Sequence, residues 1–468
     1  MKIIYSLLLP SLFCSLTLIL ISQNKSYESL TINEEYANDE NDVNHPCISE
    51  DQYRLLESNC NTNSQLLGLQ ILNTTEVISL AWPLQATSGL KDCSYYRISA
   101  YVDQNTASGA FQDFNCGINT YDGHRGTDIS IWPNNFYKMD NNLVKVIAAA
   151  AGTIIDKHDG EFDKNCSGNN QTANYLVIQH TDGSRALYFH MKKNSLTSKS
   201  IGQPVAEGEF LGIVGSSGSS SGPHLHFEVW SGATIATRID PFAGSCNSLN
   251  QNSCWKSQKA YKETAIIKAS TNTTDIVIPP CPGTEILNES DVFQLPFQGT
   301  GLPAGYAKFY IYIRDEVNGL IGDMSILNPD GSTYMSWTYN STSDNKIRIQ
   351  GWSKKLPTVA GKYLFKSSYN GTTCSSAFEL VSPTHSYIVE AVSAILIYPN
   401  PSNGIFTIET NNSNADELEI YNLLNSKIFQ SELIDQKTEL LLSIPGGVYF
   451  YKIKGNHQII CTGKLVKE

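Results

Sequence analysis

Short strand-like runs separated by turn signals dominate the chain from residue 81 onward. Around residue 129, apolar and polar residues alternate with a period of two, which is typical of a half-buried strand. Two apolar runs, 175–180 and 185–190, flank an Asp-Gly pair, which favours a hairpin turn. Only 17% of the residues are charged, and 33 Gly and 24 Tyr further favour strands and turns over long helices. The sequence therefore predicts a mainly β protein built from antiparallel sheets.

The 468 residues suggest about three folded domains together with processing segments. We predict six consecutive segments: 1–22, a signal peptide; 23–79, a leader or pro-segment; 80–245, an antiparallel β domain that carries the chemistry; 246–265, a connector; 266–385, a β-sandwich accessory domain; and 386–468, a small C-terminal β-sandwich. A disordered spacer is the alternative interpretation of 23–79.

The first residues indicate the compartment. Met1 and Lys2 precede an uncharged apolar stretch that ends at Ile21, which is the pattern of a secretory signal peptide cleaved after Ser22. An N-terminal membrane anchor is the alternative. No later stretch has the roughly 20 apolar residues that a membrane span needs, so no transmembrane segment is expected after signal cleavage. A net charge of −12 argues against a nucleic-acid partner.

The 11 cysteines of an exported chain are expected to be mostly paired in disulfides. Cys14 leaves with the signal peptide, and Cys461 leaves if the C-terminal segment is cleaved, so nine cysteines remain, and an odd count means one free thiol or an intermolecular pair. None of the nine occurs in the histidine motifs described next, so they are interpreted as structural cross-links. Cys281 and Cys374 are a candidate pair, because they lie near the two ends of the accessory domain.

Two short motifs contain residues that suit metal chemistry. His224 and His226 point to the same face if their segment is a strand, although two surface histidines on an edge strand also fit. His124 and Asp128 share a face if their segment is extended, and an ordinary loop histidine is the alternative. His190 ends the second strand of the hairpin, where a structural or solvated histidine is also common.

Together these motifs meet the requirements of a catalytic zinc site. Such a site takes three protein ligands and keeps one position for water, and His124, Asp128 and one histidine of the pair supply three ligands. The ion lowers the pKa of the bound water toward about 7. A second histidine can move the proton to a leaving amine, and another can donate a hydrogen bond to the developing oxyanion.

This set of residues resembles the lysostaphin/LytM family of zinc metalloendopeptidases, which cleave peptidoglycan cross-links. Further segments that match the family are 174–180, 187–190, 205–208, 211–215 and 222–228. The resemblance implies an antiparallel β fold of the duplicated hybrid motif type for the zinc metallopeptidase domain, 80–245, and one Zn²⁺ per chain. It implies that the zinc ligands are His124, Asp128 and His226. It further implies that His224 is the general base and that His190 stabilises the transition state.

Two aromatic residues are predicted to line the substrate groove. Tyr188 lies two positions before His190 and shares its face in a regular strand. Trp132 belongs to an aromatic insertion, 132–139, close to Asp128, and a surface hairpin packed for stability is the alternative for this insertion. Members of the family can carry a leader that blocks the zinc until it is removed, so the resemblance also implies that the segment 23–79 lowers activity.

The last 80 residues or so resemble the C-terminal sorting domain of the type IX secretion system. The resemblance rests on the Pro399-Asn400-Pro401 turn, the Pro-Gly-Gly segment that begins at Pro445, and the Gly463-Lys464 terminus. It implies the type IX secretion machinery as a partner and export across the outer membrane, so that the protein is secreted or held at the cell surface.

The sequence thus predicts a secreted zinc metalloendopeptidase that hydrolyses peptide bonds by zinc-bound water attack with histidine acid/base help. Peptidoglycan peptides are the predicted substrate, with extracellular protein as a second possibility, and export favours foreign bacterial wall over the cell's own. Two alternatives remain open: a catalytically silent regulator on the same zinc fold, and a surface protein that binds wall or glycan through residues 266–385.

Overall fold

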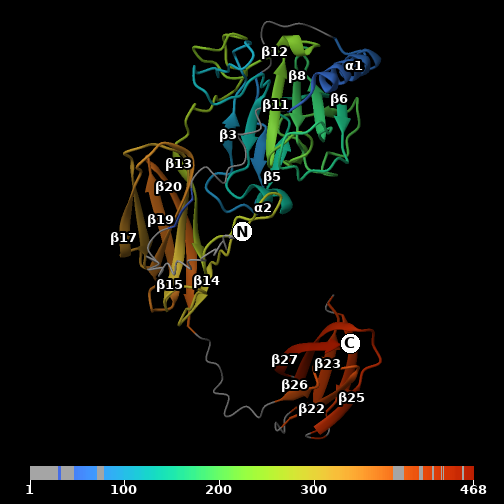
Figure 1. Ribbon diagram of the computed structural model, residues 1–468, viewed down its shortest axis with the longest axis vertical. Helices are drawn as coiled ribbons and strands as arrows, with labels where there is room; N and C mark the ends of the chain where they lie inside the picture. The colour runs from blue at the N-terminus through green and yellow to red at the C-terminus, as the bar shows by residue number, and fades with distance from the viewer. Residues whose placement is uncertain are drawn as a thin grey trace, which may run out of the picture. The chain divides into compact units, whose positions relative to one another are not determined.

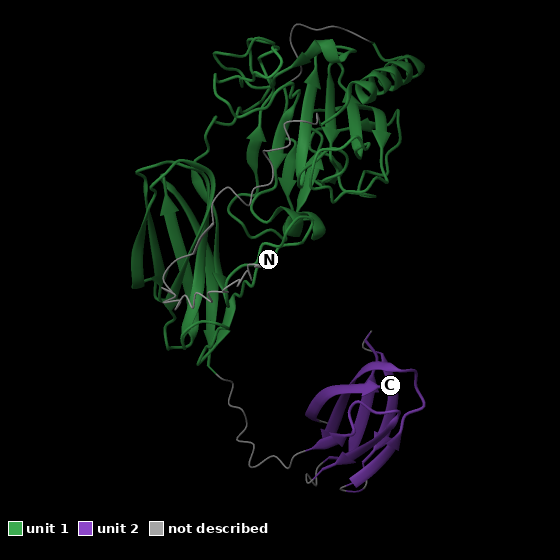
Figure 2. Cartoon of the chain, viewed as in Figure 1, with its two compact units in different colours: residues 1–382 green, residues 383–468 purple. Residues whose placement is uncertain are grey.

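The computed structural model of the chain contains two compact units, residues 1–382 and 383–468 (Figures 1 and 2). It describes residues 30–32, 47–70, 79–382, 395–410, 415–423, 426–433, 435, 437–455 and 458–468. The predicted signal peptide lies outside the described residues, as does most of the first half of the predicted leader.

The structure is mostly strand, as the sequence predicts. Helical segments in the described residues are limited to α1 (Glu50–Leu66), α2 (Asn135–Asp140) and a short 3₁₀ helix, η2 (Ile235–Thr237). A search of the described part of the chain finds no helix with the length and apolar character that crossing a membrane requires.

An eight-stranded antiparallel sheet forms the centre of the first unit (Figure 1). Its strands, in spatial order, are β3 (Arg97–Ala100), β4 (Thr127–Ser130), β11 (His224–Trp230), β8 (Arg185–Phe189), β7 (Tyr175–Gln179), β6 (Gly152–His158) and β9 (Pro204–Val205), with β12 (Arg238–Ile239) paired to β11. The hairpin predicted around Asp182-Gly183 is confirmed, because β7 and β8 pair directly across it.

A second, three-stranded sheet completes this domain. It contains β10 (Phe210–Ile213), β5 (Val144–Ile147) and β2 (Leu84–Ala86). Fully buried side chains from both sheets, among them Ile129, Leu225, Val146 and Leu211, belong to one hydrophobic cluster. The larger sheet therefore buries one face against this core, and its other face carries the polar residues described below beside the apolar cluster that receives helix α1.

Residues of the predicted connector, 246–265, also pack into this core. Trp255 is buried there with Phe242, and its backbone bridges to Leu80 at the start of the domain. The segment is thus part of the domain rather than a spacer between domains.

Two sheets form the β-sandwich that follows. The first contains β1 (Leu30–Ile32), β18 (Asn345–Lys355), β15 (Tyr306–Glu316) and β13 (Ala265–Asn272). The second contains β14 (Val292–Gln294), β20 (Thr372–Val381), β19 (Gly361–Tyr369), β16 (Ile321–Leu327) and β17 (Thr333–Asn340). Aromatic side chains from both sheets, such as Phe309 and Phe365, form its core.

The second unit is a small sandwich with its own core. One sheet contains β21 (Leu396–Tyr398), β22 (Ile405–Glu409) and β25 (Lys437–Leu441). The other contains β24 (Lys427–Glu432), β23 (Glu417–Tyr421), β26 (Gly447–Gly455) and β27 (Gln458–Lys467).

The disulfides join segments that are distant in sequence. The bonds are Cys93–Cys374, Cys116–Cys246 and Cys166–Cys281. The candidate pair Cys281–Cys374 is therefore wrong, because each of these sandwich cysteines bonds to a residue of the preceding domain instead. Two covalent links thus hold the sandwich to the domain that contains the histidine motifs.

Helix α1 packs against the large sheet beside β6 (Figure 1). Ser49 caps its first turn and exchanges hydrogen bonds with Gln52 in a capping box. Tyr53, Leu56 and Cys60 from its buried side join a cluster with side chains of β6, β7, β8 and β11. Residues 47–70 of the predicted leader are therefore an ordered part of the first unit and not a spacer.

Candidate metal centre and active site

Strands β4 and β11 bring the two sequence motifs together. They pair antiparallel, with Asp128 opposite His226 and Ser130 opposite His224. On β11, Leu225 and Phe227 have no exposed surface and point into the core, so His224 and His226 share the opposite face. His124 lies just before β4, close enough for its ring to reach the same place.

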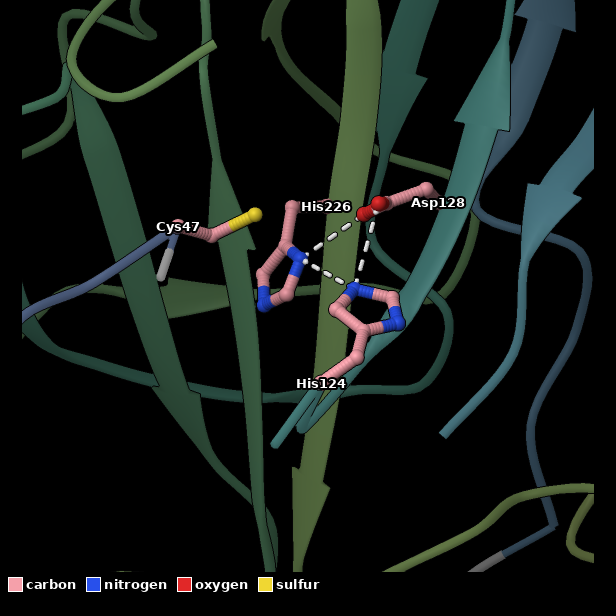
Figure 3. A group of neighbouring side chains, drawn as sticks. All are labelled: Cys47, His124, Asp128 and His226. Atoms are coloured by element: carbon pink, nitrogen blue, oxygen red, sulfur yellow. Dashed lines mark hydrogen bonds and ion pairs between the residues drawn. The ribbon is translucent and has the colours of Figure 1, made fainter. Parts of the chain in front are cut away.

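Three ligand atoms meet at this point, as Figure 3 shows. His124 Nε2 lies 3.1 Å from Asp128 Oδ2 and 3.2 Å from His226 Nδ1. His226 Nδ1 lies 2.8 Å from Asp128 Oδ1. A tetrahedral zinc ion with bonds of about 2.0–2.1 Å separates its ligands by about 3.3 Å, so the spacing and the donor set fit zinc.

The outer nitrogens of the two rings are held by fixed acceptors. His124 donates from Nδ1 to the Tyr101 carbonyl oxygen at 2.6 Å, and His226 donates from Nε2 to Glu228 Oε1 at 2.9 Å. Trp230 donates to the other oxygen of Glu228. These bonds hold the outer N–H of each ring, so the nitrogen that faces Asp128 is the one that becomes available to a metal when the ring is neutral.

Asp128 is present as the carboxylate. Burial acts to raise the pKa of this carboxyl, but the rings of His124 and His224 lower it, and the net result is a pKa well below its usual value. A buried anion with two imidazole nitrogens around it is an arrangement that favours a cation between them.

The two remaining histidines lie beside this group. The ring centroids of His190 and His224 are 4.7 Å apart, and His224 Nε2 is 3.6 Å from Asp128 Oδ1. His190 donates from Nδ1 to the Ser217 carbonyl at 2.7 Å, and His224 donates from Nδ1 to the Gly222 carbonyl at 2.8 Å. Burial lowers the pKa of His190, so its ring is neutral and offers an Nε2 lone pair.

Tyr188 does not line a groove, contrary to the sequence prediction. It has no exposed surface, packs on Phe227 in the core, and accepts a hydrogen bond from the Ala149 amide at 2.8 Å. The strand alternation fails because His190 follows the end of β8 and has a φ of 63°. This left-handed backbone turns the histidine away from the face that Tyr188 occupies.

The prediction for Trp132 is also corrected. Its ring is buried in a cluster with residues of the sandwich, including Tyr312 at a centroid distance of 6.2 Å. The insertion 132–139 overlaps helix α2: Phe136 and Met139 are buried in the core of the histidine-bearing domain, whereas Trp132 and the Tyr137 amide, which donates to Glu285, contact the sandwich. It therefore joins two domains rather than forming a wall of the metal centre.

Three residues at the centre were not singled out from the sequence. Glu228 follows His226 by two positions on β11, so strand alternation alone was enough to find it. Tyr121 stacks on the His124 ring at a centroid distance of 4.3 Å. Cys47 Sγ lies 2.8 Å from the Tyr121 hydroxyl, 74 positions away in sequence, and within 4.8 Å of the three ligand atoms. Cys47 is a free cysteine, as are Cys60 and Cys254, so the interpretation as structural cross-links is wrong for these three residues.

Comparison with known families agrees with this geometry. Residues 122–241 match the model of peptidase family M23. The chain carries an M23 peptidase domain. All five histidine and aspartate residues of the site lie inside that match. Residues 396–468 match the secretion system C-terminal sorting domain, which directs export by type IX secretion to the cell surface or beyond.

Several curated proteins are similar to parts of the chain. Lysostaphin from Staphylococcus staphylolyticus is 25% identical over 228 residues, which are 46% of this chain and 40% of that protein. Cell division protein DipM from Caulobacter vibrioides is 32% identical over 120 residues, or 25% and 19% of the two chains. Peptidoglycan DD-endopeptidase ShyB from Vibrio cholerae is 45% identical over 56 residues, or 12% of each. The chain thus spans less than half the length of each relative.

Two solved structures are similar to parts of the chain as well. The catalytic domain of lysostaphin from Staphylococcus simulans is 21% identical and covers 31% of this chain and 89% of that one, with a TM-score of 0.21. A zinc containing peptidase from Vibrio cholerae is 22% identical and covers 35% and 39% of the two chains, with a TM-score of 0.22.

Proposed function

We propose that this protein is an exported zinc metalloendopeptidase that hydrolyses peptide bonds in peptidoglycan cross-links. The observation that carries the proposal is the trio of His124 Nε2, Asp128 and His226 Nδ1, spaced for one tetrahedral ion, with two further histidines beside it. His124, Asp128 and His226 hold the zinc. When bound, the ion supplies Lewis-acid chemistry, because it polarises a carbonyl and makes water more acidic.

His224 is the general base in this proposal. Its Nδ1–H donates to the Gly222 carbonyl, so in the neutral ring Nε2 is the basic nitrogen, and it lies 3.6 Å from Asp128 Oδ1. Nε2 accepts a proton from the attacking water and then gives it to the leaving amine when the carbon–nitrogen bond breaks.

His190 stabilises the oxyanion of the transition state. Its Nδ1–H is committed to the Ser217 carbonyl, so it donates from Nε2 only when the ring carries a second proton. In that form it places a positive charge and a hydrogen-bond donor beside the developing negative charge.

The substrate class follows from the relatives and the sorting domain. Lysostaphin and the peptidoglycan DD-endopeptidase ShyB are similar to parts of this chain, and the latter acts on peptidoglycan, as its name says. The sorting domain directs the chain out of the cell, where foreign wall material is the accessible peptidoglycan. Extracellular protein is the second substrate to test.

The test is the release of new amino groups from purified peptidoglycan by the zinc-loaded chain. Wild type and Cys47→Ala are assayed together, because Cys47 Sγ lies at the site. We expect amine release that His224→Ala lowers by about 10²–10⁴-fold without loss of bound zinc. Full amine release by His224→Ala, or none by any zinc-loaded variant, contradicts the proposal.

A further inference from the structure

A cysteine of the N-terminal leader lies at the proposed metal centre. Cys47 Sγ and the ligand atoms of His124, Asp128 and His226 all lie within 4.8 Å of one another. The same sulfur forms a second group of this kind with the two histidines assigned to catalysis. In Figure 3 the Cys47 side chain points toward the ring of His226.

The centre has a place for one more ligand. A tetrahedral zinc ion with three protein ligands keeps a fourth position, and a cysteine thiolate is among the commonest zinc ligands. His190, which has a ligand atom within 4.8 Å of the Cys47 sulfur, is fully buried, and its Nε2 has no hydrogen-bond partner among the described residues. The buried ligand atoms around Cys47 thus face one another, and His190 Nε2 among them lacks a hydrogen-bond partner in the described residues.

Helix α1 holds the thiol in place. Tyr53 donates to Glu228, the same carboxylate that orients His226. Arg125, next to the ligand His124, lies over the Tyr53 ring at 4.6 Å and pairs with Glu50 on the helix. The helix therefore contacts the residues that support the metal ligands. Because it begins at Glu50, shortly after Cys47 in the chain, these contacts also hold Cys47 near the ligands.

We propose that Cys47 is the fourth ligand of the metal, and that the leader closes the active site through this bond. When the metal binds, the Cys47 thiol releases its proton to solvent and the sulfur takes the position that water and substrate need. The protein is latent until the segment that carries Cys47 is displaced or removed. This inference rests on the zinc site of the proposed function, but its first test does not depend on peptidase activity.

The test replaces zinc with Co²⁺ in the full chain, because a thiolate bound to Co²⁺ gives a charge-transfer absorption band in the near ultraviolet. We expect this band in the wild type and its loss in both Cys47→Ser and Cys47→Ala, with Co²⁺ still bound. Cys60→Ala is the matched control, because Cys60 lies on α1, the helix that follows Cys47, is fully buried, and belongs to neither group of ligand atoms. A band that persists without Cys47, or that is lost in Cys60→Ala, overturns the inference.

Alkylation provides a second readout, measured by mass spectrometry of the Cys47 peptide. We expect zinc to slow the alkylation of Cys47 by at least about tenfold, a difference of about 1.4 kcal/mol. Equal rates with and without zinc overturn the inference.

Amine release separates this inference from the proposed function. If Cys47→Ala is faster than wild type, both are supported. If the cobalt band depends on Cys47 but no variant cleaves peptidoglycan, the ligand assignment stands and the proposed function is wrong. If Co²⁺ does not bind at all, both are overturned.

Discussion

Glu228 links the metal centre to helix α1. One of its oxygens accepts from His226 Nε2 at 2.9 Å and from the Tyr53 hydroxyl, and the other accepts from Trp230 at 2.9 Å. It is fully buried, so its bonds fix the orientation of the His226 ring and raise its basicity as a ligand.

We therefore expect Glu228→Gln to weaken zinc binding by about 10–100-fold. The measurement is a competition titration against a chromophoric chelator, with circular dichroism to confirm the fold. Glu161→Gln is the matched control, because Glu161 pairs with His158 in a half-exposed histidine–carboxylate contact. Unchanged zinc affinity in Glu228→Gln is the result that contradicts this role.

At the scale of the element, helix α1 packs on the large sheet through one apolar face. Leu56 is buried with Tyr53 and Cys60 against the large sheet, whereas the neighbouring Leu55 has 63% of its surface exposed. Leu56 therefore contributes to the docking of the helix, and Leu55 does not.

Leu56→Ala is expected to weaken this docking by about 2–5 kcal/mol, because it leaves a cavity under the helix. In the zinc-free protein, Cys47 then becomes accessible more often, and its alkylation rises by more than about tenfold. Leu55→Ala is the control and keeps the wild-type rate. Equal alkylation rates in the two variants show that the packing of α1 does not position the thiol.

Local periodicity predicts which strand residues share a face and where the hairpin turns. It fails where contacts between distant segments determine the position of a residue. The alternation along β4 and β11 predicts that Asp128 and His226 lie on polar faces, and the Asp-Gly pair predicts the β7–β8 hairpin. The positive φ of His190 breaks the alternation, which no local pattern reveals. The position of Cys47 depends on how helix α1 docks on the large sheet. The number of residues between Cys47 and the histidine motifs therefore does not predict that they meet.

At the scale of the whole molecule, a buried charge cluster joins the M23 domain to the sandwich. Lys138 on α2 pairs with Asp92 at 2.9 Å, and Lys268 on β13 pairs with the same carboxylate at 3.1 Å and with Glu289 at 2.9 Å. The side chains of Lys138, Asp92 and Lys268 are all under 10% exposed. The insertion that the sequence placed near the substrate thus serves the contact between the two domains.

Asp92→Asn is expected to destabilise this unit by about 3–5 kcal/mol, because it leaves two buried ammonium groups without their shared anion. The midpoint of thermal unfolding is the measurement, and the adjacent Cys93–Cys374 disulfide keeps the domains linked in both proteins. Glu207→Gln removes the exposed pair with Lys256 and is expected to cost less than about 1 kcal/mol. An Asp92→Asn midpoint as high as that of Glu207→Gln contradicts a structural role for the cluster.

The central claim is that one zinc ion, held by His124, Asp128 and His226, gives the chain its peptidase activity. The most direct measurement removes the metal from Cys47→Ala with a chelator and returns Zn²⁺ stepwise while amine release from purified peptidoglycan is recorded. The account predicts that release stops in the metal-free protein and returns fully at one zinc per chain, and that His226→Ala never regains it. Amine release that persists in the metal-free protein, or that returns in His226→Ala, contradicts the account.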